Sequence, residues 1–287
     1  MTRFVYVNGA YKRYAEAAVH AEDRGFQFAD AIYEVIEVLD GGLVDATRHL
    51  ARLERSLREL SIPPPMSKAA LLQVIDQVIR RNRVREGIVY LQVTRGAGPR
   101  DFALPAPESP PTLVVLARAQ RRGWSAELAE TGIAVKTTPD NRWARCDIKT
   151  VMLLPAVLAK DEARRAGARE AWFIDAAGNV TEGASSNAWI VTADGALVTH
   201  PLDNHILPGV TRATVMNVAK AEGMKIEERT FSKDEALKAR EAFVTSATNI
   251  VMPVVKLDGA AIGDGRPGPL AQRLRLRFHH IAEFSAG

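Results

Sequence analysis

Short apolar runs that end in tight turns constrain the fold of this chain more than any other sequence feature. The run at 4–7 is followed by Asn8-Gly9, and the run at 33–39 ends in the glycine-containing turn 40–42. Turns of this kind join neighbouring antiparallel strands. The expected helices form separate blocks at 49–60, after Ser67 and at 210–222. Hairpins combined with segregated helices predict an α+β fold.

The length of the chain suggests two domains. Its 287 residues, of which 47% are apolar and 25% charged, have ordinary globular composition. Since a domain takes roughly 100–200 residues, two domains are expected. The polar stretch 119–123 is the predicted linker, which gives an N-terminal domain at 1–118 and a C-terminal domain at 124–287.

Charge and composition argue against several functional classes. The net charge is only +4, and the densest basic run, 273–277, is interleaved with leucines, so we expect no nucleic-acid partner. The single cysteine permits no internal disulfide, and the six histidines lack the spacing of metal ligands. No apolar run approaches the ~18 residues of a membrane span, and the N-terminus lacks a signal-peptide pattern. We therefore expect a soluble, cytoplasmic protein without a membrane partner or a metal.

Lys149 stands between a polar segment and an apolar run with near-helical spacing. The spacing predicts that a helix begins at this lysine. A cation is disfavoured at a helix start by the helix dipole, whereas a neutral amine or an imine suffers less. Taken alone, Lys149 is more simply interpreted as a solvated surface lysine.

Three further segments complete a chemical set. The segment 181–187 is expected to join two strands and to place Glu182 beside a turn of small residues. The segment 207–212 leads into a helix whose first N–H groups can bind a phosphate, and 245–249 is a polar turn after a strand. Each is also compatible with an ordinary loop or helix start. Together, a lysine, a carboxylate and a phosphate cradle are what pyridoxal 5'-phosphate requires.

These motifs carry a resemblance to a known family. Matching stretches run through most of the chain, at 24–35, 49–53, 92–96, 147–149, 181–187 and 207–212. In this order they resemble the fold-type IV pyridoxal-phosphate enzymes, which are similar to branched-chain aminotransferases, and most closely the D-amino-acid aminotransferases. The resemblance implies a small N-terminal α/β domain and a larger C-terminal pseudobarrel domain. It also implies a homodimer, with the cofactor between the two domains.

The resemblance also implies roles for individual residues. Lys149 would be the Schiff-base lysine and the base that moves the substrate proton, and Glu182 would pair with the pyridinium nitrogen. Arg52 would clamp the phosphate, and Leu207 would pack against the cofactor ring. The remaining phosphate donors would be Val210, Thr211, Ser246 and Ala247. The substrate would meet Tyr33, Val35, Arg100 and the residue at position 102.

Position 102 departs from the family pattern. After the turn that begins at Arg95, the family has Arg-x-His, whereas this chain has Arg100-Asp101-Phe102. A histidine can donate a hydrogen bond to the substrate carboxylate and a phenyl ring cannot, so we expect Phe102 to weaken that recognition.

The resemblance implies transamination between D-amino acids such as D-alanine and 2-oxo acids such as 2-oxoglutarate and pyruvate. The alternatives are a transaminase for branched-chain L-amino acids or (R)-amines, and an enzyme like 4-amino-4-deoxychorismate lyase. Arg100 beside Tyr33 favours an amino-acid substrate over an amine. The presence of both Lys149 and Glu182 argues against a non-catalytic binding protein.

Overall fold

The computed structural model describes residues 3–105, 109–121 and 123–285. The chain forms two compact units, the first made of Met1–Arg122, Ile148–Met152 and Glu283–Gly287 and the second of Gly123–Asp147 and Leu153–Ala282. The second unit thus begins inside the predicted linker, but two segments of the predicted C-terminal domain belong to the first unit. Residue 122 of that linker, and the outermost residues 1–2 and 286–287 of the predicted domains, lie outside the described ranges.

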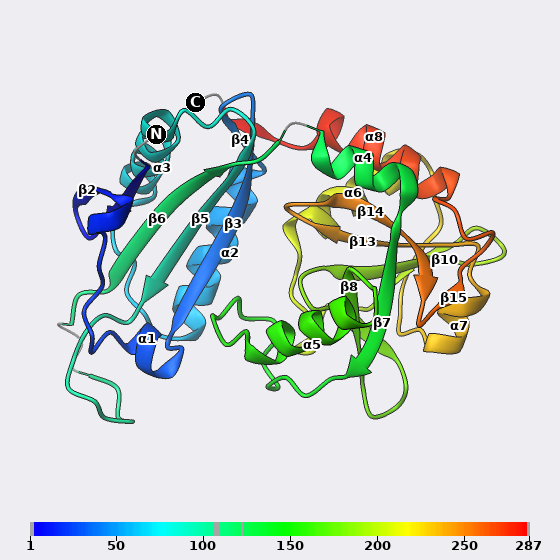
Figure 1. The fold of residues 1–287 in the computed structure, drawn as a ribbon, viewed down its shortest axis with the longest axis horizontal. Helices are drawn as coiled ribbons and strands as arrows, with labels where there is room; N and C mark the ends of the chain where they lie inside the picture. Colours follow the sequence, from blue (N-terminus) through cyan, green and yellow to red (C-terminus); the bar gives the residue numbers. More distant parts are fainter. Residues whose placement is uncertain (1–2, 106–108, 122, 286–287) are drawn as a thin grey trace. The chain divides into compact units, whose positions relative to one another are not determined.

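The first unit contains an antiparallel sheet with helices packed on one face (Figure 1). Among the described residues, seven strands lie in the order β16-β4-β3-β5-β6-β1-β2. Their bounds are β1 Phe4–Val7, β2 Ala10–Arg13, β3 Ala31–Leu39, β4 Gly42–Val44, β5 Gly87–Thr94, β6 Thr112–Ala119 and β16 Phe284–Ser285. The helices are α1 Arg24–Phe28, α2 Ala46–Glu59 and α3 Lys68–Asn82, with a 3-10 turn at Tyr14–Glu16. As predicted, Ser67 caps α3 by accepting a hydrogen bond from the N–H of Ala70.

Strand β3 separates two environments because successive side chains of a strand point to opposite faces. Ile32, Glu34 and Ile36 are fully buried, and α2 packs against this strand. Tyr33 and Val35 lie on the other face and are only half-buried. A charged glutamate therefore occupies an otherwise apolar face, and the two faces of β3 have different chemistry.

The second unit is built on a larger mixed sheet. Within the part of the chain that the structure describes, the strand order is β12-β11-β10-β13-β14-β7-β8-β9, with β15 paired to β14. The strand bounds are β7 Ile133–Pro139, β8 Glu170–Ile174, β9 Val180–Gly183, β10 Asn187–Val191, β11 Leu197–Thr199, β12 Ile226–Glu228, β13 Glu241–Ser246, β14 Ile250–Leu257 and β15 Ala260–Ala261. The terminal strand β9 also contacts β10 in the middle of the order, so the sheet curls on itself.

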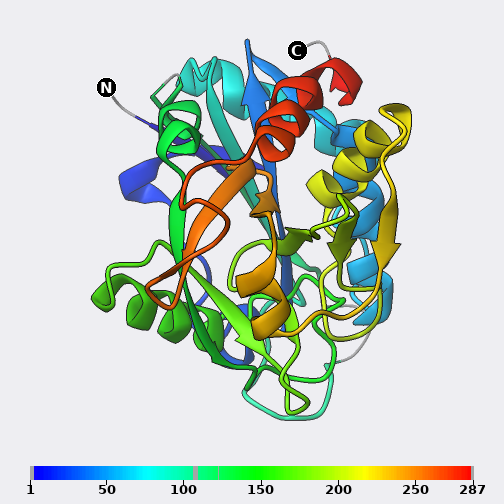
Figure 2. The ribbon, with the colours of Figure 1, turned by 90° about the vertical axis from the view of Figure 1, so that its right-hand side faces the viewer.

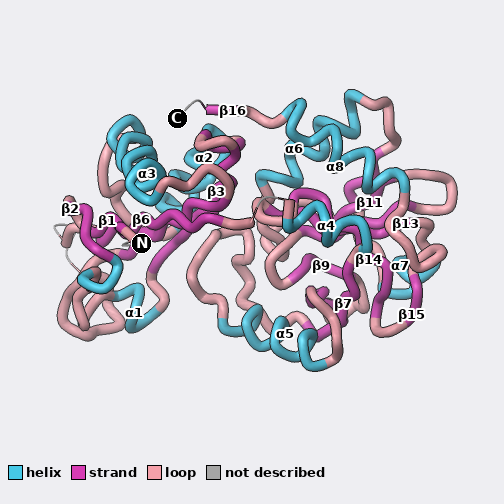
Figure 3. The backbone as a smooth tube through the Cα atoms, turned by 45° about the horizontal axis from the view of Figure 1, so that its top comes forward, coloured by secondary structure: helices cyan, strands magenta, loops and turns pink. Residues whose placement is uncertain are grey.

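Helices pack against this curled sheet. They are α4 Trp124–Thr131, α5 Leu154–Arg165, α6 Val210–Ala221, α7 Lys233–Lys238 and α8 Pro269–Ile281. Figure 2 shows α8, in red, beside the orange strand β14, and Figure 3 shows α6 next to α8. Aromatic pairs fill the interior: the rings of Trp189 and Phe243 stack 5.5 Å apart, and Trp172 meets Phe231 edge-on at 6.1 Å. The two units together have the predicted α+β architecture.

Membrane-spanning helices and metal-binding clusters are both absent from the described residues. No helix there is both long and apolar enough to cross a membrane. The same residues hold no group of three or more histidine, cysteine, aspartate or glutamate side chains arranged to bind a metal ion.

Candidate active site

Lys149 lies in an irregular segment of the first unit that pairs with β3, and not at a helix start. The N–H of Tyr33 donates to its carbonyl oxygen at 3.0 Å, and Thr150 forms a β-bridge with Ile32. The following helix, α5, begins only at Leu154, with Pro155 in its first turn. The predicted helix start at Lys149 is therefore wrong, because pairing with β3 determines the backbone here and the apolar spacing applies only from Leu154 onward.

The amine of Lys149 lies over an aromatic ring. Its Nζ is 4.2 Å from the centre of the Tyr33 ring, which stacks on Tyr90 with 5.6 Å between centres. Burial, together with the neighbouring Tyr33, raises the pKa of Tyr90 to about 12, and its hydroxyl donates to Gln92 at 2.7 Å. The backbone N–H of Lys149 donates to Ser56 Oγ of α2 at 3.4 Å. The lysine is thereby tied to both β3 and α2.

Arg52 lies one helical turn before Ser56 on α2 and contacts the buried face of β3. Its Nε and Nη2 donate to the two carboxylate oxygens of Glu34, each at 2.7 Å. Nδ1 of His49 lies 2.7 Å from Glu34 Oε2. Burial alone would raise the pKa of Glu34, but the charge and hydrogen bonds of Arg52 and His49 outweigh it and hold that pKa at about 2. Burial lowers the pKa of His49, which favours the neutral ring.

The sequence analysis gave no role to Glu34 or His49. A signal for them does exist, because the alternation of β3 puts a carboxylate on its apolar face. Likewise, the spacing of α2 puts His49 and Arg52 together on its buried face.

Val35, Arg100 and Phe102 were predicted to meet the substrate with Tyr33. Val35 lies two residues beyond Tyr33 on the same face of β3 and pairs in register with Tyr90. Arg100 and Phe102 lie in an exposed segment, where the guanidinium of Arg100 is 5.2 Å from the centre of the Phe28 ring. Phe102 packs on the same ring at 5.6 Å and is 82% exposed. Within the described ranges, no hydrogen bond or ring contact joins Arg100 to Tyr33.

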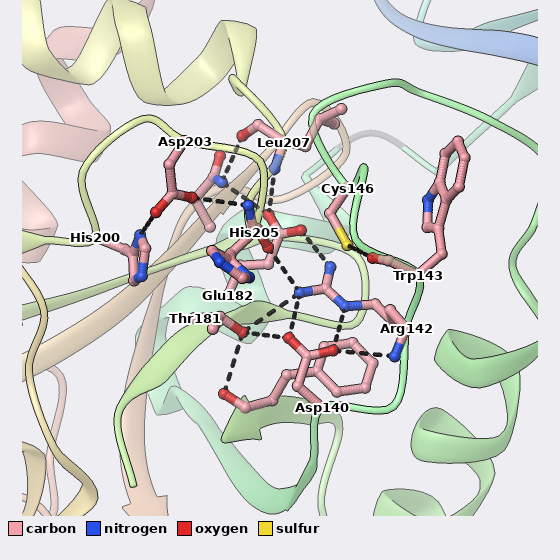
Figure 4. Close-up of polar contacts among 12 residues, drawn as sticks. Asp140, Arg142, Trp143, Cys146, Thr181, Glu182, His200, Asp203, His205 and Leu207 are labelled. Atoms are coloured by element: carbon pink, nitrogen blue, oxygen red, sulfur yellow. Dashed lines mark hydrogen bonds and ion pairs between the residues drawn. The ribbon is translucent and has the colours of Figure 1, made fainter. Parts of the chain in front are cut away.

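Glu182 lies inside strand β9 of the second unit and not in a connecting loop, because Thr181, Glu182 and Gly183 all belong to that strand. Its Oε1 accepts from Nη1 of Arg142 at 2.5 Å. Its Oε2 accepts at 3.1 Å from the side-chain amide of Asn187 and at 3.1 Å from the N–H of Leu207 (Figure 4). Three donors thus orient the carboxylate.

Arg142 was missed by the sequence analysis. Figure 4 shows its guanidinium between Glu182 and Asp140. Nε and Nη2 donate to Asp140 at 2.9 and 2.8 Å, and the group lies 4.3 Å from the centre of the Phe173 ring. Burial opposes ionisation of both partners, but their pairing prevails, so the pKa of Asp140 is lowered and that of Arg142 raised. No sequence pattern pointed to Arg142, because Glu182 is forty residues away along the chain.

The predicted phosphate donors gather at the same end of the second unit's sheet. Asn187, besides contacting Glu182, donates to the carbonyl of Leu207 at 2.9 Å, just before α6 begins at Val210. It also pairs in register with Thr245, so Ser246 and Ala247 follow directly on the neighbouring strand and turn. Gly209 allows this approach, because a Cβ there would lie 2.0 Å from Asn187 Oδ1. The carboxylate, the helix start and the turn therefore converge around Asn187.

The start of α6 has the features of an anion site. Its N-cap residue is Gly209, which has no side chain to accept a hydrogen bond from the first N–H groups of the helix. Helix N-termini of this kind favour a phosphate. The Thr211 side chain is buried at the same position and carries a hydroxyl.

Comparison with known proteins now bears on the identity of this site. The family described as amino-transferase class IV matches residues 31–257. The chain belongs to this family.

Individual relatives of this aminotransferase agree with the family assignment. A D-alanine aminotransferase of Staphylococcus haemolyticus is 39% identical over 280 residues, covering 97% of this chain and 98% of the relative. The crystal structure of the Escherichia coli branched-chain amino acid aminotransferase superposes with a TM-score of 0.91 at 27% identity, covering 98% of this chain and 95% of that one. A second branched-chain amino acid aminotransferase, solved with pyridoxamine 5'-phosphate, gives 0.88 at 27% identity, covering 98% and 94%. The predicted resemblance to fold-type IV aminotransferases is confirmed.

Proposed function

We propose that this aminotransferase exchanges the amino group between D-amino acids, D-alanine among them, and 2-oxo acids such as 2-oxoglutarate and pyruvate. One observation carries the proposal: Lys149 presents its amine over Tyr33 in a chain 39% identical, nearly end to end, to a D-alanine aminotransferase. The branched-chain aminotransferases share the fold at a lower identity of 27%. We therefore prefer D-amino acids to branched-chain L-amino acids as substrates.

The cofactor is pyridoxal 5'-phosphate, and the residues of the second unit fit it. Glu182, oriented by Arg142 and Asn187, would accept a hydrogen bond from the protonated pyridine nitrogen. The uncapped start of α6 and the following turn residues supply phosphate donors. The residues assigned to this cradle are Val210, Thr211, Ser246 and Ala247. In the proposal, Leu207 packs against the ring, and Arg52 of the first unit adds a cation for the phosphate.

When bound, the cofactor supplies an electron sink that makes the Cα proton of an amino acid removable. Lys149 Nζ takes that proton and returns it, and the Tyr33 ring orients the amine. Tyr33 and Arg100 bind the substrate carboxylate, with Val35 and Phe102 beside the substrate. Burial keeps Tyr90, stacked on Tyr33, protonated, so no negative charge develops behind the ring that carries the amine.

The proposal includes a homodimer that works in the cytoplasm, with two domains divided near 119–123. An exposed apolar surface on α5 supports the dimer. Leu154, Val157 and Leu158 of that helix are 57–67% exposed, although large apolar side chains are usually buried. A second copy of the chain would cover them.

The first test replaces the proposed proton-transfer base. Lys149→Ala should lower turnover by at least the ~10²–10⁴-fold that a positioned acid–base group contributes, because the variant lacks the amine that takes the Cα proton. The measurement is pyruvate formation from D-alanine and 2-oxoglutarate, with the absorbance of bound cofactor recorded in parallel. Near-normal turnover in this variant would remove Lys149 from the proposal.

The same assay tests the substrate. Wild-type protein is given D-alanine, L-leucine or (R)-1-phenylethylamine with 2-oxoglutarate as acceptor, and D-alanine should react fastest. Faster turnover of L-leucine would contradict the proposed D-amino-acid substrates and favour branched-chain L-amino acids. It would not contradict the proposed cofactor.

A further inference from the structure

A buried ionic cluster in the first unit contains two residues, Glu34 and His49, that have no part in the function described so far. We name Glu34, His49 and Arg52 the anchor triad. Glu34 comes from β3 and the other two residues from α2, and the three side chains are 0%, 4% and 9% exposed. Both carboxylate oxygens of Glu34 are engaged at 2.7 Å.

Stability alone does not explain such a cluster. Replacing a buried ion pair by apolar side chains of similar volume is often neutral or stabilising, because burying charges costs desolvation. The neighbours of Glu34 on the same strand face, Ile32 and Ile36, are apolar and fully buried. Apolar residues in place of the whole ionic cluster would therefore suit this site structurally, which directs attention to what Glu34 does for Arg52.

Glu34 fixes the direction of the Arg52 guanidinium. Contacts from Nε and Nη2 to two oxygens form a bidentate pair, which sets both the plane of the group and its rotation. His49 holds Glu34 Oε2 from the same helix, so the carboxylate cannot turn away. Ser56, one turn further along α2, accepts from the N–H of Lys149. The guanidinium and the lysine segment are thereby aligned on one helix.

We propose that Glu34 and His49 are positioning residues that set the Arg52 guanidinium for the phosphate of the cofactor. This inference rests on the proposed function, in which Arg52 binds that phosphate. Glu34 also neutralises the charge of Arg52 inside the protein, so the guanidinium acts on the phosphate through directed N–H groups more than through net charge. Glu34 itself touches neither cofactor nor substrate.

The experiment compares the affinities of the full-length protein, freed of cofactor by dialysis, for pyridoxal 5'-phosphate and for pyridoxal. Pyridoxal lacks only the phosphate, so the ratio of the two dissociation constants isolates phosphate recognition. Glu34→Gln should weaken pyridoxal 5'-phosphate by about tenfold or more, since a hydrogen bond to a charged group contributes that much, and leave pyridoxal unchanged. Equal weakening of both ligands, or of neither, overturns the inference.

Asp30→Asn is the matched control. Asp30 is a partly buried carboxylate of the first unit, 13% exposed, that pairs with two arginines, Arg24 and Arg95, at 2.9 and 2.7 Å. Its loss disturbs the unit in a comparable way and should leave the ratio of the two affinities at the wild-type value. A ratio that falls as far as in Glu34→Gln would mean that general loosening is responsible, and would overturn the inference.

His49 provides a second variant pair that does not depend on the folding of Glu34→Gln. His49→Leu removes the hydrogen bond to Glu34 and should lower the affinity ratio several-fold. His49→Gln, whose amide can donate in place of Nδ1, should restore much of it. An unchanged ratio in His49→Leu would overturn the assignment of His49.

Arg52→Ala separates this inference from the function on which it rests. If Arg52→Ala loses the preference for pyridoxal 5'-phosphate over pyridoxal while Glu34→Gln keeps it, the positioning role alone is overturned. An unchanged ratio in Arg52→Ala would overturn the phosphate role of Arg52, and the positioning role with it.

Discussion

Glu34 and Glu182 are both buried and both paired with an arginine. Arg52 pairs bidentately with Glu34, whereas Arg142 is shared between Glu182 and Asp140. In the first unit, Arg52 faces Glu34 through two of its nitrogens, and His49 adds a further contact. In the second unit, Arg142 divides its nitrogens between Glu182 and Asp140, and Glu182 draws its other donors from Asn187 and Leu207. One carboxylate is bound bidentately by an arginine, and the other by a dispersed set of donors.

The difference shows that the two buried carboxylates are stabilised in different ways. Glu34 is fully buried, so its charge depends on one cation for compensation. Glu182 is held by several donors, each of which contributes a part of its stabilisation. Breaking single contacts should therefore cost more in the first unit than in the second.

The largest effect is expected for Arg52→Met. Removing one partner of a buried pair leaves an uncompensated charge and costs roughly 3–5 kcal/mol of the free energy of unfolding. Urea unfolding of cofactor-free protein measures this loss. The double variant Arg52→Met with Glu34→Gln should recover part of it, because no unpaired charge remains. Additive losses in the double variant would contradict the coupling.

Lowering the pH should weaken the Glu34–Arg52 pair and reduce the free energy of unfolding by a somewhat smaller amount. The pKa of Glu34 is lowered from 4.5 to about 2, so its contribution is complete above the unfolded value. That contribution is lost as the pH falls from 4.5 towards 2, and amounts to about 3 kcal/mol. Unfolding free energies of wild type and Glu34→Gln should converge over this interval. A constant difference between them across that range would contradict the assigned pKa.

Arg142→Gln should cost less, roughly 1–3 kcal/mol, as expected for buried groups that lose one of several partners. Glu182 keeps Asn187 and Leu207, and Asp140 keeps the hydroxyl of Thr181 at 2.8 Å. The measurement is urea unfolding under the conditions used for Arg52→Met. A loss as large as that of Arg52→Met would abolish the contrast between the units.

The smallest effect concerns the exposed segment of the first unit. Phe102→His should tighten apparent D-alanine binding by at most about tenfold, because a hydrogen bond at so exposed a position contributes roughly 0.5–1.5 kcal/mol. The measurement compares the apparent affinity for D-alanine in the wild type and in Phe102→His. No tightening would mean that Phe102 acts through its packing on Phe28 and does not limit the carboxylate pocket.

Local patterns predicted much of the fold. The strand at 33–39 lies within β3, the helix at 49–60 matches α2, and the helix expected after Ser67 is α3, capped by that serine. Short-range rules suffice there because each signal and its partner lie within a few residues. Helix α4, which follows directly on the predicted linker, was not predicted.

The site was harder to predict because its contacts are distant in sequence. The backbone around Lys149 pairs with Tyr33 and Ile32, more than a hundred residues earlier, so its neighbours in sequence wrongly predicted a helix. Arg142 was not predicted because its partner Glu182 lies forty residues away in the sequence. The identities of the proposed cofactor residues came from the family resemblance, and their roles stay predictions.

Because Lys149 belongs to the first unit, the gene cannot be divided at the linker without removing this lysine from that unit. The chain leaves the second unit after Asp147, contributes five residues to the first, and returns at Leu153. A gene cut at the linker would therefore separate the first unit from its lysine, although every strand of its sheet except β16 would remain. Recombination between relatives at that point would exchange the lysine together with the second unit. A fragment that ends at the linker would therefore lack the amine that is proposed to move the substrate proton.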